Sequence, residues 1–97
     1  MLFRSLESEF GSMADLNFLD LYSGSGAVGV EALSRGSSKV VSVERHQPTA
    51  LIAEKNFELV KGAEGYFEVI VSDVKKYLGN PSHIQFDIIF KIGRAHV

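Results

Sequence analysis

A glycine-rich turn between an apolar run and a helix-like segment limits most strongly how this chain can fold. The turn reads Gly24-Ser-Gly26-Ala-Val-Gly29 and follows the apolar run 17–22. A Gly-x-Gly-x-x-Gly pattern is weak alone, but between a strand and a helix it indicates a nucleotide-binding turn. The first two glycines permit a tight turn that a ligand can approach closely, and the third lets helix and strand pack together. The segment predicts a strand–turn–helix unit with a ligand site above the turn.

The rest of the chain alternates between strand-like and helix-like segments. Strands are predicted at residues 17–22, 39–43, 66–71 and 86–90, and helices at 27–35, 48–61 and 73–78. Apolar strands separated by helices predict a parallel sheet covered on both sides. Because crossovers are right-handed, the predicted fold is α/β: a truncated, Rossmann-like, doubly wound parallel sheet with strand order 3-2-1-4.

Composition excludes several classes of protein. Among 97 residues there is no cysteine, which excludes disulfides, thiolate zinc sites and cysteine nucleophiles within this chain. A net charge of −2 does not indicate the basic surface with which proteins bind nucleic acid. If the parent protein binds RNA, its basic surface would lie outside these residues. The histidines, His46, His83 and His96, share no metal-ligand spacing, and no metal site is predicted.

Membrane and export signals are also absent from the sequence pattern. No apolar run approaches the roughly 20 residues needed to span a bilayer. The first ten residues carry Arg4, Glu7 and Glu9 and therefore have no signal-peptide core. We expect a cytoplasmic protein.

Acidic residues near the ends of the predicted strands favour one ligand class. Asp20 lies four residues before Gly24, where dinucleotide sites usually have an apolar residue. S-adenosyl-L-methionine carries a cationic amino group and a sulfonium and therefore needs a nearby acceptor, which Asp20 would supply. The alternative for Asp20 is a helix-capping or solvated loop acid.

Two further acids follow the second and third strands. Glu44 lies 20 positions after Gly24, where a carboxylate would accept from ribose hydroxyls. Asp73 could accept from an adenine amino group. Their structural alternatives are a surface acid for Glu44 and a cap of the next short helix for Asp73.

The segment 20–36, DLYSGSGAVGVEALSRG, closely resembles the RsmD-like family of bacterial ribosomal-RNA methyltransferases. Residues 43–45, 54–59, 71–73 and 86–90 also occur in that family's order and spacing. The resemblance implies an enzyme that uses S-adenosyl-L-methionine to methylate N2 of a guanine in small-subunit ribosomal RNA. It implies ribosomal RNA or the small-subunit particle as partner, and we expect a monomer without metal or membrane association.

The motifs and the resemblance together predict one cofactor site. Its expected residues are Asp20, Tyr22, Ser23, Gly24, Ser25, Gly26, Gly29, Glu44, Arg45, Asp73 and Val74.

The sequence departs from the family where the catalytic loop should stand. In the family, Asp or Asn followed by Pro-Pro-Tyr comes after the fourth strand, whereas Lys91-Ile92-Gly93 follows Phe90 here. The family's basic N-terminal RNA-binding segment is missing too. We therefore predict no catalytic residue, an inactive chain, and an unpaired far edge on the strand 86–90.

The residues at both ends of the sequence do not fit the pattern of the rest of the domain. Residues 2–5 can be encoded as CTC TTC CGA TCT, and the reverse complement of that string lies inside a possible coding sequence for residues 91–95. Both strings resemble a widely used sequencing adapter. We expect residues 1–5 and 91–97 to be non-native and residues 6–90 to form the cofactor-binding core.

Three alternatives stay open. The chain could come from another Rossmann-like methyltransferase that acts on DNA, protein or a small molecule. It could be part of an NAD-dependent oxidoreductase, in which the pyrophosphate would lie at the helix N-terminus. It could also be a non-catalytic nucleotide-binding module.

Overall fold

The computed structural model describes residues 7, 12–79, 86–91 and 94–96. The elements in chain order are β1 (Asn17–Leu21), α2 (Ala27–Ser34), β2 (Lys39–Glu44), α3 (Gln47–Glu58), β3 (Tyr66–Val71), α4 (Val74–Leu78), β4 (Ile88–Lys91) and β5 (Arg94–His96).

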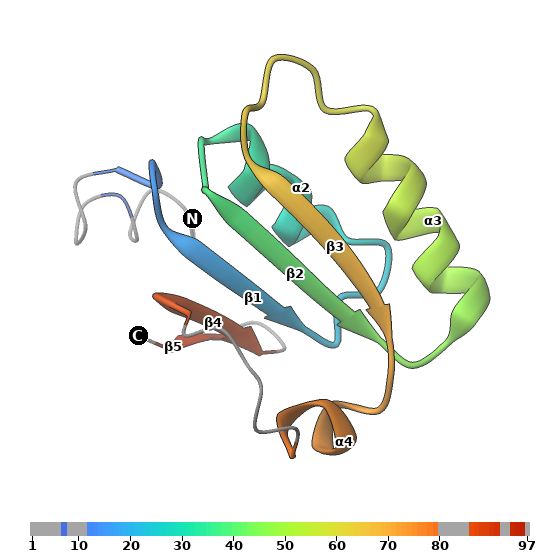
Figure 1. The fold of residues 1–97 in the computed structure, drawn as a ribbon. Helices are drawn as coiled ribbons and strands as arrows, with labels where there is room; N and C mark the ends of the chain where they lie inside the picture. The colour runs from blue at the N-terminus through green and yellow to red at the C-terminus, as the bar shows by residue number, and fades with distance from the viewer. Residues whose placement is uncertain (1–6, 8–11, 80–85, 92–93, 97) are drawn as a thin grey trace.

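The strands form one sheet in the order β3-β2-β1-β4-β5 (Figure 1). The pairs β3–β2, β2–β1 and β1–β4 are all parallel. This confirms the predicted order 3-2-1-4 and the α/β fold class. Since the strands run in the same direction, their carboxyl ends meet at one edge of the sheet.

The fourth strand begins later than predicted. It was expected over residues 86–90, but β4 runs from Ile88 to Lys91. Asp87, just before β4, makes two hydrogen bonds with Asn17 at the start of β1. Its backbone N–H donates to the Asn17 carbonyl at 2.9 Å, and its Oδ2 accepts from the Asn17 N–H at 2.7 Å. The regular ladder therefore begins only after Asp87.

The expectation of an unpaired edge on β4 was wrong. β5 pairs with β4 in antiparallel orientation, with Phe90 opposite Ala95 and Lys91 opposite Arg94. A segment of three residues is too short to show an alternating pattern, so no sequence pattern predicts this strand. The pairing supplies hydrogen-bond partners that the edge of β4 would otherwise lack.

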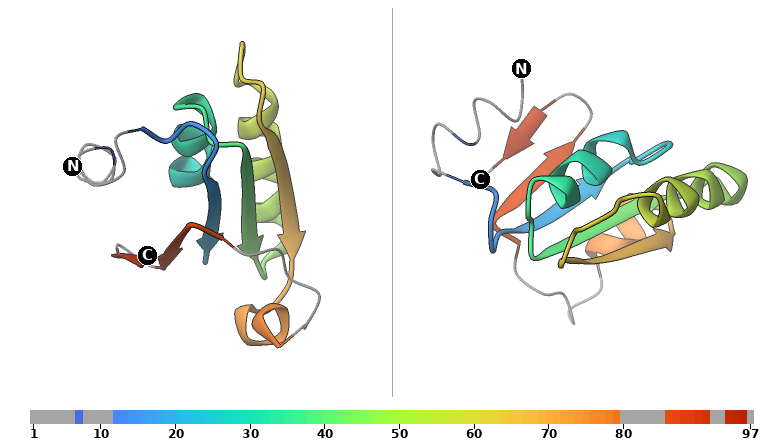
Figure 2. Two further views of the ribbon diagram at one scale, coloured as in Figure 1. Left: turned by 60° about the vertical axis from the view of Figure 1, so that its left-hand side comes forward. Right: turned by 90° about the horizontal axis from the view of Figure 1, so that it is seen from above.

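Helices α2 and α3 lie together on one side of the sheet, whereas α4 lies toward the other side (Figures 1 and 2). Strand side chains alternate between these sides. Phe18 and Val40 belong to a cluster with Phe57 of α3, and Leu19 and Val41 belong to a second cluster with Val74 of α4. The central strands β1 and β2 are therefore buried on both faces, whereas β3, at the edge of the sheet, has no buried residue.

The outer helix and strand are joined by an aromatic contact. Phe57 of α3 stacks on Phe67 of β3 with ring centroids 4.9 Å apart and an interplanar angle of 8°.

Helix α3 ends at Glu58 rather than at residue 61, and Gly62 follows with φ of 75°. Gly36, which follows the end of α2, has φ of 99°, the left-handed conformation in which helices commonly end.

Candidate functional site

A cavity of about 280 Å³ lies at the carboxyl ends of β1, β2 and β3. Its lining residues are Tyr22, Val43, Glu44, Arg45, Ser72, Asp73 and Val74. Five of them, Tyr22, Glu44, Arg45, Asp73 and Val74, belong to the predicted site. The fold thus brings together residues from three turns that are far apart in the sequence.

The glycine turn beside this cavity is held against β2. The Ser23 N–H donates to the Val43 carbonyl at 3.0 Å, and the Gly26 N–H donates to the Ser23 carbonyl at 2.9 Å. Gly24 and Gly26 have φ of 56° and 82°, a conformation that favours glycine. Gly26 is the N-cap of α2 and, as a glycine, makes no side-chain cap; in the first turn of the helix the Gly29 backbone donates to the Asp20 carboxyl.

Tyr22 departs from ordinary backbone geometry. Its φ is 59°, in the left-handed region that costs a non-glycine residue roughly 1–2 kcal/mol. Its side chain is 47% exposed and lines the cavity. Strained residues of this kind concentrate at functional sites, where the surrounding structure holds them in place.

Glu44 connects the glycine turn to the start of α3. Its Oε1 accepts from the Gly24 N–H at 2.9 Å, and its Oε2 accepts from the His46 N–H at 2.9 Å. Glu44 is therefore more than a surface acid. Each carboxylate oxygen has a second lone pair and can still accept from a ligand hydroxyl.

Asp73 caps the N-terminus of α4, the role that the sequence analysis gave as the alternative to ligand binding. Its Oδ1 accepts from the N–H groups of Lys75 and Lys76 at 2.9 and 3.3 Å, at the start of α4. Asp73 nevertheless lines the cavity. A contact with a ligand there stays a prediction.

Asp20 lies beneath the turn rather than on the cavity wall. It is 2% exposed on β1, which excludes a solvated acid, whereas its hydrogen bond from the backbone of Gly29 in the first turn of α2 agrees with the helix-capping alternative. Burial raises the pKa of Asp20 from 3.8 to about 7, and a hydrogen bond from the backbone of Gly29 opposes this rise. Its Oδ2 has no hydrogen-bond partner within the described part of the chain.

The remaining predicted residues shape the turn through packing. A Cβ on Gly29 would lie 2.8 Å from Phe57 Cζ, and one on Gly26 would lie 3.1 Å from Ala53 Cβ. The Ser25 carbonyl accepts from Asn56 Nδ2 at 2.9 Å, which joins the turn to α3. Gly26 and Gly29 thus keep α2, α3 and the sheet close together.

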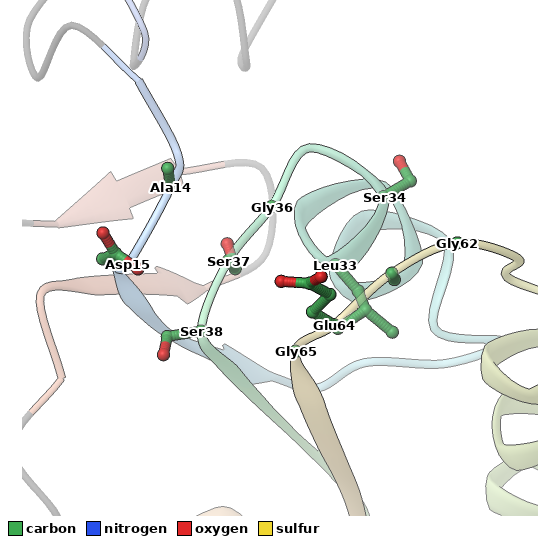
Figure 3. Close-up of a pocket in the computed structure, with 11 residues that line it drawn as sticks. Ala14, Asp15, Leu33, Ser34, Gly36, Ser37, Ser38, Gly62, Glu64 and Gly65 are labelled. Atoms are coloured by element: carbon green, nitrogen blue, oxygen red, sulfur yellow. The ribbon is translucent and has the colours of Figure 1, made fainter.

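Another cavity, of about 470 Å³, lies at the opposite edge of the sheet (Figure 3). It is lined by the segments 14–15, 33–38 and 62–65, excluding Arg35. None of the predicted site residues lines it. These loops carry no sequence motif that would predict a cavity.

The described residues contain neither a metal-binding cluster nor a membrane-spanning helix. No cluster of three or more His, Cys, Asp or Glu side chains suited to a metal occurs among the described residues. His46 is exposed, with Nδ1 2.7 Å from Thr49 Oγ1; His83 lies outside the described residues, and His96 lies in β5. Within the same part of the chain, no helix combines the length and apolarity needed to cross a membrane.

A parallel sheet of order 3-2-1-4, a glycine turn after its first strand and acids after the next two strands define a Rossmann-like α/β domain. The sequence profile of the family described as conserved hypothetical protein 95 matches residues 1–91. The chain belongs to this family, and its resemblance to RsmD-like proteins is confirmed.

Individual relatives agree with this assignment. Ribosomal RNA small subunit methyltransferase D of Haemophilus influenzae is 36% identical over 73 residues, which are 74% of this chain and 38% of that protein. The structure of yhhF from Escherichia coli, provisionally described as a methyltransferase, superposes with a TM-score of 0.67 at 28% identity, over 78% of this chain and 42% of that one.

A third relative was solved in complex with SAH and is also provisionally described as a methyltransferase. It has a TM-score of 0.68 at 26% identity, over 89% of this chain and 24% of its own length. The chain thus spans less than half the length of each of these relatives.

Proposed function

We propose that this chain binds S-adenosyl-L-methionine at the carboxyl edge of β1, β2 and β3. The observation that carries the proposal is the cavity of about 280 Å³ whose wall gathers Tyr22, Glu44, Arg45, Asp73 and Val74 beside the glycine turn. Ligands of doubly wound sheets bind at this edge. The relative solved with SAH supports the same ligand class.

The chemistry of the wall suits this ligand. Glu44 has lone pairs left for ribose hydroxyls, and Asp73 can accept from an adenine amino group. Tyr22 and Val74 offer apolar surface for a flat base. The cationic methionine part would lie near the glycine turn, above the buried carboxyl of Asp20.

Asp20 disfavours a dinucleotide. A pyrophosphate would bring negative charge to the glycine turn, above the buried Asp20 carboxyl at the end of β1, where dinucleotide sites usually have an apolar residue. Like charges at short range repel, and more strongly where water is partly excluded. An NAD-dependent oxidoreductase is therefore the weaker interpretation.

We further propose that the chain is the cofactor-binding part of an RsmD-like methyltransferase acting on guanine N2 of small-subunit ribosomal RNA. Family membership and the name of the Haemophilus influenzae relative support this substrate. The acceptor would be ribosomal RNA or the small-subunit particle, and the protein would act as a cytoplasmic monomer. The predicted Asp/Asn-Pro-Pro-Tyr loop does not follow Phe90, so no residue of this chain is assigned to catalysis.

The cofactor proposal is tested by isothermal titration of the chain with S-adenosylhomocysteine and, separately, with NAD. We expect heat of binding from S-adenosylhomocysteine and none from NAD. Val74→Glu, which places a charge in the wall, should remove binding. Leu51→Glu, at an exposed position of α3, is the control that should retain it. Binding of NAD, or equal binding in both variants, would contradict the proposal.

A further inference from the structure

A side chain of α3 holds the glycine turn that lies between β1 and α2. Within the turn, the Gly26 N–H donates to the Ser23 carbonyl at 2.9 Å, which closes a four-residue turn. From outside the turn, Asn56 Nδ2 donates to the Ser25 carbonyl at 2.9 Å, across 31 positions of the sequence. A carbonyl oxygen only accepts, so the amide nitrogen of Asn56 is the atom that must face it.

The Asn56 bond fixes the orientation of a whole peptide group. The Ser25 carbonyl and the Gly26 N–H belong to the same planar, trans peptide unit, in which they point in opposite directions. Asn56 binds the oxygen of this unit, and the Ser23 carbonyl binds its N–H. With both ends bonded, the peptide group that leads into α2 cannot rotate freely.

Close packing brings α3 to the turn. Helices α2 and α3 lie on the same side of the sheet (Figure 1). A Cβ on Gly26 would lie only 3.1 Å from Ala53 Cβ and 3.4 Å from Phe57 Cε2. Ala53 and Phe57 are 0% and 1% exposed, so neither can move away without opening the core. Asn56 follows Ala53 by three positions and therefore lies on the same face of α3, beside the turn.

Asn56 lies outside the proposed cofactor cavity. The wall of that cavity includes Glu44, which also accepts from the Gly24 N–H, but it does not include Asn56. Asn56 instead lines a groove between α2 and α3, together with Ala27 and Leu59. A ligand in the cavity would therefore share the Glu44 carboxylate but would leave the Asn56 bond intact.

We propose that Asn56 is a positioning residue that holds the glycine turn in its binding conformation before the cofactor arrives. The inference rests on the proposed function, since it requires that the cofactor lies against this turn. A loop that is already ordered spares the ligand the entropic cost of ordering it. Asn56 therefore contributes to affinity without touching the ligand.

Removing the Asn56 amide should separate affinity from stability. Alanine is a better helix former than asparagine inside α3, which offsets the loss of one hydrogen bond. We expect the Tm of Asn56→Ala to stay within about 4 °C of that of the unsubstituted chain. Its affinity for S-adenosylhomocysteine should fall about three- to tenfold in titration calorimetry, with a less favourable entropy of binding.

Two conservative variants test the amide itself. Asn56→Asp keeps the size of the side chain, but an ionised carboxylate has no hydrogen to donate and repels the Ser25 carbonyl. It should lose at least as much affinity as Asn56→Ala, and it decides the matter if Asn56→Ala does not fold. Asn56→Gln keeps the amide on a longer side chain and should recover part of the lost affinity.

Lys55→Ala is the matched control. Lys55 precedes Asn56 in α3 and is exposed. Lysine and alanine are both good helix formers, so this substitution changes the helix little. It should leave both the affinity and the motion of the glycine turn unchanged.

The motion of the turn provides a measurement that does not depend on a ligand. In the chain without ligand, the ¹⁵N NMR order parameters of the Ser25 and Gly26 amides should be about 0.85, as in rigid backbone. In Asn56→Ala and Asn56→Asp they should fall toward about 0.6, the value below which backbone counts as flexible.

The two measurements distinguish failure of this inference from failure of the cofactor site. In a chain that binds S-adenosylhomocysteine, the proposal is overturned if Asn56→Ala and Asn56→Asp leave either the affinity or the order parameters unchanged. An equal loss of affinity in Lys55→Ala also overturns it. If no form of the chain binds the ligand while the order parameters still fall, the result supports Asn56 as the residue that holds the turn and contradicts the proposed cofactor site.

Discussion

Replacing Gly29 with alanine separates two physical effects of opposite sign at one position. Gly29 lies inside α2 (Ala27–Ser34). Alanine is the better helix former, by about 1 kcal/mol in a helix interior. Helix propensity alone therefore predicts a more stable protein, whereas the packing around Gly29 predicts a less stable one.

The structure gives the size of the packing effect. The new Cβ would lie 2.8 Å from Phe57 Cζ, 2.9 Å from Ser42 Oγ and 3.1 Å from Val40 Cγ1. These three neighbours are at most 1% exposed and cannot swing into solvent. Overpacking of this kind costs about 1–3 kcal/mol. Because the neighbours are buried and two of the contacts are under 3.0 Å, we expect a cost in the upper half of this range, about 2–3 kcal/mol. With the gain in propensity of about 1 kcal/mol subtracted, the net loss is about 1–2 kcal/mol, or roughly 5–15 °C in Tm for a domain of this size.

Urea unfolding followed by circular dichroism measures this loss. The midpoint should fall while the slope m stays the same, because the native surface area hardly changes. The control is Gly24→Ala, which introduces left-handed strain at φ of 56° but no contact within 4 Å. In the double variant with Phe57→Leu, the losses should be less than additive, since the shorter side chain relieves the contact.

Two results would refute this reasoning. Gly29→Ala could equal or exceed the unsubstituted chain in stability, in which case helix propensity outweighs packing. The losses of Gly29→Ala and Phe57→Leu could also add fully, in which case the ring is not what excludes a Cβ at this position.

Three further predictions concern the site. Because burial raises the folded-state pKa of Asp20 to about 7 from 3.8, the free energy of unfolding should fall as the pH rises between these values. Asp20→Asn should flatten that dependence in urea unfolding at pH 5 and 8, by at most about 3 kcal/mol. Glu44→Gln should weaken S-adenosylhomocysteine binding about ten- to a hundredfold in titration calorimetry, because an amide has one acceptor oxygen for the two backbone N–H groups that Glu44 binds. Glu54→Gln, at an exposed position, should leave the affinity unchanged. The 97-residue chain should incorporate no tritiated methyl group into small-subunit ribosomal RNA, since Lys91-Ile92-Gly93 follows Phe90; turnover would place catalytic groups within this chain.

Local sequence patterns were sufficient for the parallel core of the sheet. Apolar runs separated by helix-length segments predicted four strands, and the right-handed crossover rule ordered them as β3-β2-β1-β4. These patterns did not predict the start of the fourth strand or its pairing. Just before β4, Asp87 makes hydrogen bonds with Asn17, 70 positions away in the sequence, and β5 pairs with the outer edge of β4. Neither effect is visible in a window of neighbouring residues.

In the candidate site too, the sequence predicted the positions of residues but not the hydrogen bonds that they make. Spacing placed Glu44 and Asp73 after the second and third strands, and both line the cavity there. Spacing did not show that Glu44 accepts from the Gly24 N–H, or that Asp73 caps α4. These bonds depend on how the turns approach one another once the sheet has formed.

The sequence by itself determined the strand–turn–helix unit, the fold class and the edge of the sheet where a ligand would bind, because these follow from residue type and short-range spacing. Only the tertiary structure decided where Asp20 lies. Both faces of β1 are apolar, so the sequence does not say which side Asp20 takes. The packing of α2 through Gly29 buries its carboxyl beneath the turn, opposite Ser42, where loss of water raises the pKa of Asp20 to about 7.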